Sequence, residues 1–317
     1  MLNVYSGHFK DDAKLLASAS GGAATALAES VISKNGVVFG VRYSADFRSA
    51  EYCCIEEIDD LGQIKGSKYI QAQRNNIFHM VEEKLAENRL VLFVGLGCDI
   101  AAIKSYCRMR SIDTYNLYTV DILCHGPSPK EVQESYVIEL EKKYGAIIKE
   151  FTIRFKKEGW FPFYIRAVFS NGSEHIESFN NSDFGRAFYY ISKPSCTQCQ
   201  FKGKNHQGDL CIGDYWGLSD KMSGWNKNGV SIIVVQSEKG KHLLSILPDD
   251  FVIQKADQVL FLRGNPMYEN SRKQVNNYNE FMNDLRAKGL HFAVSKLPRN
   301  RVSFLDRVRK AIKRTTE

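Results

Sequence analysis

Two short apolar runs in this chain each lead to a cysteine, and this pattern constrains the fold more than any other feature. Leu90–Val94 leads through a glycine turn to Cys98, and Tyr118–Leu123 leads directly to Cys124. A C-x-x-C loop supplies two more thiols, Cys196 and Cys199. In an open α/β sheet, ligands bind outside the carboxyl ends of the strands. The sequence therefore predicts an α/β protein in which four thiols meet at one edge of a sheet.

The apolar periodicity alternates between that of a helix and that of a strand along the first half of the chain. Helices are predicted at residues 18–34, 77–88 and 100–110, and strands at 37–41, 90–94 and 118–123. This alternation indicates parallel strands joined by right-handed crossovers. After residue 149 the pattern becomes that of half-buried antiparallel strands, followed by a further strand, helix and strand between 230 and 253. We therefore expect an α/β fold with a parallel or mixed sheet and crossover helices, plus a second α/β region that contains an antiparallel hairpin.

The length of 317 residues exceeds that of a usual single domain. We expect an N-terminal α/β domain over residues 1–149 and a second α/β domain, with the C-x-x-C loop, over residues 150–265. A basic helical tail is expected over residues 266–317.

Local signals mark one helix and one turn in detail. Ser128 is predicted to cap a helix whose third residue is Glu131, a capping box, and Gly145 is predicted to end it. Asn171 and Gly172 are predicted to form a two-residue hairpin turn in which both residues have positive φ.

The net charge of +7 is concentrated at the C-terminus. Residues 286–317 carry ten Lys or Arg against two acidic residues, so the rest of the chain has a net charge of −1. A nucleic-acid-binding protein would spread its basic residues over a folded face, so we expect no nucleic-acid partner. Apolar residues at helical spacing in residues 299–317 predict a basic amphipathic helix, suited to peripheral membrane contact or to an acidic partner. Packing of this helix on the body of the protein is the alternative.

The N-terminus has neither the basic nor the apolar region of a signal peptide, and no apolar run reaches the roughly 18 residues that span a bilayer. We therefore expect a cytoplasmic protein. In a reducing compartment its eight cysteines are expected to be thiols, metal ligands or redox groups rather than disulfides.

Soft thiolate ligands suit either an iron–sulfur cluster or zinc. Structural zinc sites with four cysteines usually draw on two paired knuckles, whereas here only Cys196 and Cys199 are paired, so the spacing favours iron–sulfur. Zinc and unligated thiols stay open as alternatives. Cys211, in a strand pattern that leads to a glycine turn, is ambiguous, and the remaining three cysteines fit core packing: Cys53, Cys54 and Cys107.

Two segments with small residues could approach a cofactor. The first opens a helix, where free N–H groups favour an anion such as a phosphate, although a glycine pair there also fits close packing or a cap. It consists of Ser20, Gly21, Gly22 and Ala23. The second would bring a cation and a phenol to a cofactor, or form a solvated loop, and consists of Gly66, Ser67, Lys68 and Tyr69.

Six segments in register together resemble the coenzyme F420 hydrogenase/dehydrogenase beta-subunit family, over residues 18 to 265. They are Ser20–Gly22, Gly66–Tyr69, Cys98–Ala101, Asp121–Pro129, Cys196–Cys199 and Asp209–Gly217. The resemblance implies a bacterial flavoprotein that binds FAD and one [4Fe–4S] cluster and moves electrons between them. Many members carry an N-terminal ferredoxin-like module with its own cysteine clusters, which is not found in this sequence. The resemblance therefore implies a separate ferredoxin-like or other redox protein as partner.

By matching positions, the resemblance implies that Cys98, Cys124, Cys196 and Cys199 hold the cluster, and that the segments at 20–23 and 66–69 line the flavin. Lys68 and His125 are our candidates for proton or hydride-stage chemistry, because both are titratable and lie in loops beside the expected cofactors. For His125, a hydrogen bond near a ligand cysteine is the alternative. Asp99 replaces a Gln found in many members, and a buried carboxylate there would lower the cluster potential.

The predicted function is that of an FAD and iron–sulfur dependent oxidoreductase. It would transfer electrons or hydride between a redox partner or deazaflavin and an unidentified small-molecule substrate, with a link to surface polysaccharide synthesis. One alternative is a non-catalytic partner subunit stabilised by zinc or iron–sulfur. A nucleotide-binding transferase that uses the glycine-started helix is the other.

Overall fold

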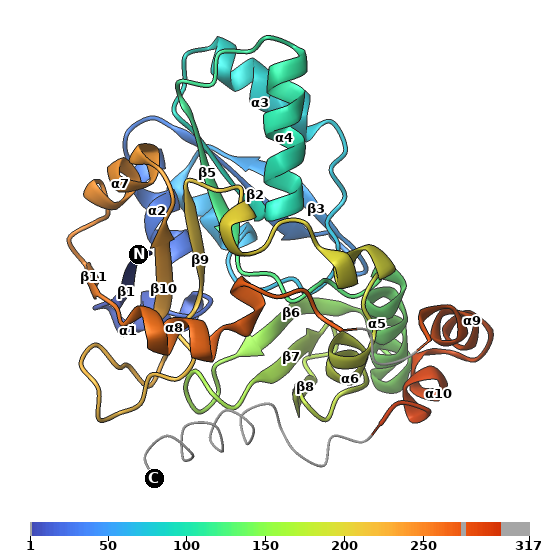
Figure 1. Cartoon of the computed structure of the whole chain (residues 1–317). Helices are drawn as coiled ribbons and strands as arrows, with labels where there is room; N and C mark the ends of the chain where they lie inside the picture. The colour runs from blue at the N-terminus through green and yellow to red at the C-terminus, as the bar shows by residue number, and fades with distance from the viewer. Residues whose placement is uncertain (1, 274–276, 299–317) are drawn as a thin grey trace.

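The computed structural model describes residues 2–273 and 277–298 and contains two sheets (Figure 1). The larger is a mixed sheet of eight strands in the order β11-β1-β10-β9-β5-β4-β2-β3. Its strands β2, β4, β5 and β9 run parallel to one another, and the others are antiparallel to their neighbours. The bounds are β1 Asn3–Phe9, β2 Val37–Tyr43, β3 Ala50–Ile55, β4 Val91–Leu96, β5 Leu117–Ile122, β9 Leu210–Asp214, β10 Ser231–Val235 and β11 Phe251–Lys255.

Helices cover both faces of this sheet, since its central strands are apolar on both sides. On one face, apolar residues of α2 (Ala23–Ile32), of α7 (Glu238–Ser245) and of the 3₁₀-helix η1 (Ile58–Gln63) share a core with Leu92 and Ile233. On the other face, α3 (Ile77–Ala86) and α4 (Gly97–Met109) pack against β2 to β5, and α8 (Gln258–Gly264) packs against β9 and β10. The short helix α1 (Asp12–Ala17) follows β1.

The smaller sheet is antiparallel, in the order β6-β7-β8, with bounds Ile148–Phe155, Tyr164–Phe169 and Glu174–Ser178. Its core is shared with four helices: α5 Lys130–Tyr144, α6 Asp183–Tyr190, α9 Tyr278–Lys288 and α10 Leu290–Ser295. Single bridges from Ser67 to Ile153 and from Ile70 to Ser128 join this part to the loops of the large sheet. Three further 3₁₀-helices are η2 Pro194–Gln198, η3 Gly203–Asn205 and η4 Pro266–Tyr268.

The expected fold class is confirmed: a large mixed sheet with crossover helices and a separate antiparallel sheet. The large sheet takes strands from both sides of residue 149, which itself lies within β6. No helix within residues 2–273 and 277–298 combines the length and apolar character needed to cross a membrane. The tail helix expected at 299–317 lies outside the described residues.

Two local predictions were wrong. Ser128 does not cap α5: the cap residue is Pro129, and the Ser128 hydroxyl has no hydrogen-bond partner among the described residues. The reason is that the Ser128 N–H donates to the Tyr69 carbonyl, which keeps this residue in an extended bridge and delays the helix. In the β7–β8 turn only Gly172 has positive φ, while the Asn171 side chain accepts hydrogen bonds from Ser173. Gly145 ends α5 in the left-handed conformation, as predicted.

Candidate functional site

A cavity of about 720 Å³ opens at the carboxyl ends of the four parallel strands. The ends of β2, β4, β5 and β9 form the floor of the cavity, and the start of α2 forms one of its walls. The small sheet and α6 contribute Arg154, Phe163, Phe188 and Tyr189. The volume lies within the range of about 300–1,000 Å³ that small-molecule and cofactor sites occupy. The cavity therefore lies where sequence reasoning expected a ligand.

Six of the eight residues expected to line a flavin do line this cavity: Ser20, Ala23, Gly66, Ser67, Lys68 and Tyr69. Gly21 and Gly22 do not, and packing explains both. A Cβ on Gly21 would lie 2.2 Å from the Gly7 carbonyl oxygen, and Gly22 has a φ of +92° beside the ring of Phe9. Gly21 thus allows a close approach of two backbones, and Gly22 allows a left-handed backbone against a ring. Close packing or a cap was the alternative that the sequence left open.

The first N–H groups at the start of α2 already have a protein partner. The Ser231 hydroxyl oxygen accepts from the Gly21 N–H at 3.0 Å and from the Ala23 N–H at 3.3 Å. The Ser20 hydroxyl donates to the Val230 carbonyl at 2.9 Å. The helix start is therefore tied to β10, and its small side chains form a smooth wall of the cavity.

Lys68 is half-buried, with its exposed part facing the cavity. Its ammonium donates to the Lys65 carbonyl at 2.7 Å and to the Gln63 carbonyl at 3.3 Å. Burial lowers the pKa of Lys68 to about 7. The residue can therefore gain or lose a proton near neutral pH, as its candidate role requires.

His125 also lines the cavity, directly after Cys124. Its ring packs against Phe188 at 4.9 Å between centroids, and its Nδ1 accepts from the Arg272 guanidinium at 3.2 Å. Burial, with the charge of Arg272, lowers the pKa of His125 to about 3. The imidazole is thus neutral at ordinary pH, which favours the positioning role over proton donation.

The structure brings the four predicted cysteine ligands to one side of this cavity. Cys98 lies in the first turn of α4, Cys124 follows β5, and Cys196 and Cys199 lie in and after η2. A Cβ on Gly126 would lie 3.4 Å from the Cβ of Cys196, while the Gly126 N–H donates to the Cys124 sulfur at 3.2 Å. Cys98 is exposed as a residue, but desolvation of its sulfur by the surrounding protein raises the pKa of Cys98 to about 11. Negative charge on Asp99, Cys196 and Cys199 acts in the same direction.

The spacing of these sulfurs is wider than zinc requires. Among the described residues, the only group of three or more candidate ligand atoms within 4.8 Å of one another is Asp121, His206 and Cys211. No three of the four sulfurs are therefore that close. A tetrahedral zinc with Zn–S bonds of about 2.3 Å would hold its sulfurs about 3.8 Å apart. The donor set and its spacing fit a larger inorganic core better than a single ion.

Asp99, beside Cys98, is buried but not isolated. Its carboxylate accepts from the Tyr52 hydroxyl at 2.9 Å and from Arg74 Nε at 2.7 Å. A second Arg74 nitrogen lies 2.5 Å from the same carboxylate oxygen. The guanidinium offsets the negative charge that the sequence placed next to this ligand, so Asp99 lowers a cluster potential less than an unpaired carboxylate would.

Sequence reasoning missed the ion pair between Arg154 and Asp214 in the cavity wall. Asp214 ends β9, the strand beside β5, and β5 leads to Cys124. The guanidinium binds both carboxylate oxygens, at 2.5 and 3.0 Å, and stacks 4.1 Å from the ring centre of Phe163. Trp160 donates to the same carboxylate at 3.1 Å. Arg154 has a φ of +67° at an irregularity in β6. The sequence around Arg154 gives no signal of such a bulge. Asp214 could have been found, because an acidic residue that follows a glycine at the end of a predicted strand is a candidate site residue.

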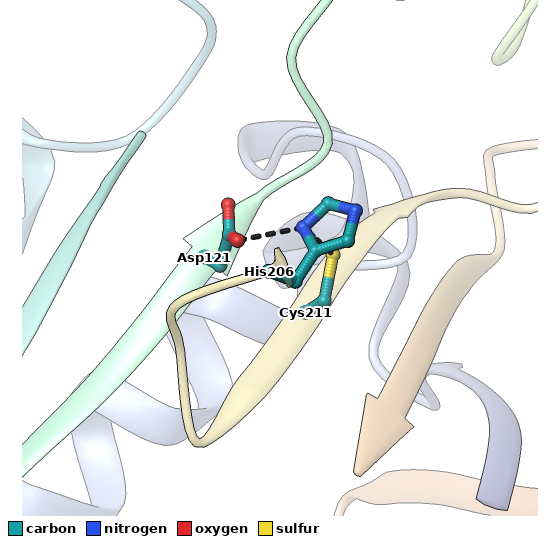
Figure 2. A group of neighbouring side chains, drawn as sticks. All are labelled: Asp121, His206 and Cys211. Atoms are coloured by element: carbon teal, nitrogen blue, oxygen red, sulfur yellow. Dashed lines mark hydrogen bonds and ion pairs between the residues drawn. The ribbon is translucent and has the colours of Figure 1, made fainter. Parts of the chain in front are cut away.

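The second group, Asp121, His206 and Cys211, is held by hydrogen bonds (Figure 2). Asp121 and Cys211 are opposite one another on β5 and β9, and His206 lies in the loop before β9. His206 Nδ1 lies 2.7 Å from Asp121 Oδ2 and 3.7 Å from the Cys211 sulfur, and Nε2 lies 2.9 Å from the Tyr268 carbonyl oxygen. A tetrahedral metal would hold the nitrogen and oxygen about 3.3 Å apart. As it stands, this group is a buried hydrogen-bonded support behind the cysteines.

The fold and the site together define an α/β protein whose ligand cavity is lined by Cys124, one of four cysteines that lie near one another. A family model for the C-terminal part of the coenzyme F420 hydrogenase/dehydrogenase beta subunit matches residues 88–258. The chain belongs to this family, and it is a redox protein of the F420 hydrogenase/dehydrogenase type.

One solved structure shares the fold over nearly the whole chain. It is a chain of the F420-reducing [NiFe] hydrogenase complex from Methanosarcina barkeri, studied by xenon derivatization. The TM-score is 0.55 at 14% sequence identity, and the match covers 98% of this chain and 91% of that one. A comparison with curated proteins finds no relative of this chain.

Proposed function

We propose that this chain is an FAD and iron–sulfur dependent oxidoreductase. In this proposal Cys98, Cys124, Cys196 and Cys199 hold one [4Fe–4S] cluster, and FAD occupies the cavity. The observation that carries the proposal is the position of Cys124, which lies among the four cysteines and also in the cavity wall. A ligand in the cavity and a cluster on the thiols would therefore be neighbours.

The chemistry of the cavity wall suits a flavin dinucleotide. Its two carboxylates, Asp99 and Asp214, are paired with Arg74 and Arg154, so they leave little negative charge in the cavity. Its other charged side chains are all basic: Lys65, Lys68, Arg272 and Lys273. A diphosphate is favoured in such a field. Apolar and aromatic side chains offer surfaces to a planar ring.

A flavin exchanges electrons in pairs or singly, and an iron–sulfur cluster carries them one at a time. In this chain the Gly126 N–H would stabilise a thiolate at Cys124, since it already donates to that sulfur. Arg272, held by His125 and by the Phe188 carbonyl, would add positive charge near Cys196. Lys68, with a pKa of about 7, is our candidate for holding or releasing a proton at its Nζ on the cavity side.

The substrate class stays open between a deazaflavin and a sugar-linked compound of surface polysaccharide synthesis. We further propose a cytoplasmic location and an external ferredoxin-like or other redox protein as partner. The solved relative is a chain of a hydrogenase complex, which supports an assembly with a redox partner.

The test is anaerobic purification with analysis of iron, acid-labile sulfide, zinc and flavin. We expect about four irons and four sulfides per chain, as one [4Fe–4S] cluster requires, with bound FAD. Cys196→Ser should lose the iron while the chain stays folded. Cys54→Ser is the matched control, because Cys54 is a half-buried thiol in β3 outside the site, and it should keep the iron.

Colourless protein with one zinc per chain would overturn the proposal in favour of a metal-stabilised subunit. A nucleotide sugar in place of FAD in the cavity would favour a transferase. Two results together would mean that the metal is structural. The Cys196→Ser variant would unfold, and the absorbance spectrum of the wild type would not change when a reductant is added.

A further inference from the structure

One of the four cysteines faces outward. Cys98 is exposed on the surface at the start of α4, whereas Cys124, Cys196 and Cys199 are half-buried. Cys124 lines the cavity and Cys98 does not. If the cluster forms as proposed above, it has a cavity side at Cys124 and a solvent side at Cys98. The solvent side is where an electron would enter or leave the protein.

One of the segments beside Cys98 is basic. Residues 191–207, which contain the C-x-x-C loop, carry three lysines and no acidic residue. Residues 65–79 also have no acidic residue, but Lys65 and Lys68 line the cavity and Arg74 is paired with Asp99, so this segment adds little charge to the surface. The acidic neighbour of Cys98 in sequence, Asp99, is buried and paired with Arg74.

Contacts between these segments hold them around the cysteines. The Lys193 ammonium donates to the Gln71 side chain, which joins residues 191–207 to the 65–79 segment. Phe201 lies against Gly97, next to Cys98, so the 191–207 segment passes the start of α4 (Figure 1). Lys202 donates at 2.6 Å to the Cys124 carbonyl, and Lys104 of α4 donates at 2.6 Å to the Gln207 carbonyl. Lys104, Lys193 and Lys202 therefore all lie along the C-x-x-C segment, with backbone carbonyls or an amide side chain as their partners.

The rest of the body has the opposite sign. Residues 1–285 carry a net charge of −1, and residues 191–207 together with Lys104 carry +4, so the remainder carries −5. A protein with this asymmetry orients an approaching acidic partner toward the basic face and repels it elsewhere. An extended polyanion such as nucleic acid would meet the negative remainder.

We propose that the basic face beside Cys98, formed by residues 191–207 with Lys104, is the docking surface for an acidic one-electron carrier protein. This inference rests on the proposed function. In each encounter the partner's redox centre would lose one electron and the centre held by the four cysteines would gain it, or the reverse. The partner is defined by its surface charge and by a redox group near that surface.

The experiment uses anaerobically prepared holoprotein and an acidic plant-type [2Fe–2S] ferredoxin as the probe. Stopped-flow spectroscopy measures the second-order rate of electron transfer, and calorimetry with both partners oxidised measures binding. We expect both the rate and the affinity to fall steeply as ionic strength rises. A basic c-type cytochrome, used as the comparison carrier, should react at least tenfold more slowly at low salt.

The double variant Lys193→Glu/Lys204→Glu should lower the rate and the affinity for the acidic ferredoxin by at least tenfold at low salt. Lys34→Glu is the matched control. Lys34 is exposed and precedes β2, so it lies at the opposite edge of the sheet from the cysteines, and this variant should behave as the wild type.

Dithionite separates failure of this inference from failure of the proposed function. If dithionite reduces an iron–sulfur centre but the ferredoxin shows no binding, or binding that is insensitive to salt and to the charge reversal, the docking surface is wrong and the proposed function stands. If dithionite reveals no iron–sulfur centre in intact, anaerobic protein, the proposed function itself fails, and the docking surface fails with it.

Discussion

Two groups of candidate metal ligands lie close together in this protein, and they differ in how their polar atoms are satisfied. In the group of Asp121, His206 and Cys211, both ring nitrogens of the histidine face oxygen acceptors, and the side chains of Asp121 and His206 are each only 2% exposed. In the four-cysteine group, the sulfurs are spread more widely, and Cys124 borders a cavity.

The comparison shows that short distances between ligand-type residues do not by themselves identify a metal site. A group whose donors and acceptors satisfy one another is complete without a ligand, since buried polar groups need partners. A group of convergent thiols with few internal partners is incomplete, and a bound core would complete it. Each prediction below tests one side of this contrast.

The largest effect is expected for Asp121→Asn. The Asp121 carboxylate accepts from His206 at 2.7 Å and from the Gln207 N–H at 3.3 Å, and loss of hydrogen bonds to a buried charged group costs about 2–3 kcal/mol. Urea unfolding of the holoprotein should show this loss in the free energy of unfolding, with iron per chain unchanged.

Asp59→Asn, at an exposed position in η1, is the control and should change stability by less than about 0.5 kcal/mol. Loss of iron from Asp121→Asn at unchanged stability would contradict the comparison, because it would make this group a metal site.

The next largest effect is expected for Lys68, which lines the cavity that Cys124 also lines. Its pKa of about 7 in the folded protein lies below the ordinary value of 10.5, so the unfolded chain binds more protons between those pH values. The free energy of unfolding should therefore rise with pH from about 7 to 10.5, by at most about 1.4 kcal/mol per pH unit. Because the amine faces a cavity, water screens part of this effect.

Lys68→Met should flatten that rise, and the exposed control Lys142→Met on α5 should not. Unfolding curves at several pH values between 6 and 10 measure the slope. Equal slopes for the wild type and Lys68→Met would show that Lys68 is no more buried than a surface lysine.

A smaller effect is expected for Cys211→Ala. The thiol is fully buried in β9, and removal of one buried sulfur leaves a small cavity that costs about 1 kcal/mol. Iron per chain should not change, whereas Cys124→Ala, just after the neighbouring strand β5, should abolish it. Loss of iron from Cys211→Ala would make Cys211 a ligand, the role that the sequence left ambiguous.

Much of the fold could be predicted from local patterns, because helix and strand periodicities act over a few residues. The strands that lead to Cys98 and Cys124 are present as expected, and so is helix α3, predicted at residues 77–88. Strands β1 and β3 were not predicted, since their residues mix polar and apolar side chains that only the neighbouring strands make buried.

The candidate site was predictable only in part. The four thiols could be identified because their residue type and their positions at strand ends carry the signal. Arg154 could not, because its role depends on a bulge and on Asp214, 60 residues away. Gly21 and Gly22, at the start of α2, were expected to line the flavin for a related reason. The residues that they pack against, Gly7 and Phe9, belong to strand β1 and are distant in sequence.

The smallest effect is expected for Ser192→Ala. The Ser192 hydroxyl is buried and has no hydrogen-bond partner among the described residues. It lies within 4 Å of the point that a Cβ on Gly126 would occupy, as does the Cys196 sulfur. A hydroxyl in that position would donate to a sulfur of the cluster and stabilise its more negative, reduced form. A hydrogen bond of about 1 kcal/mol corresponds to about 40 mV for one electron, so the variant should have a lower midpoint potential by about that amount.

A redox titration followed by electron paramagnetic resonance measures the potential of the Ser192→Ala cluster at equal iron content. Ser6→Ala is the matched control, because the Ser6 hydroxyl is also buried without a partner but lies in β1, away from the cysteines. If both variants kept the wild-type potential, an unpartnered hydroxyl beside Cys196 would carry no information about a ligand. If only Ser192→Ala shifts the midpoint potential, the unsatisfied Ser192 hydroxyl interacts with a cluster, and the four-cysteine group is the one that binds it.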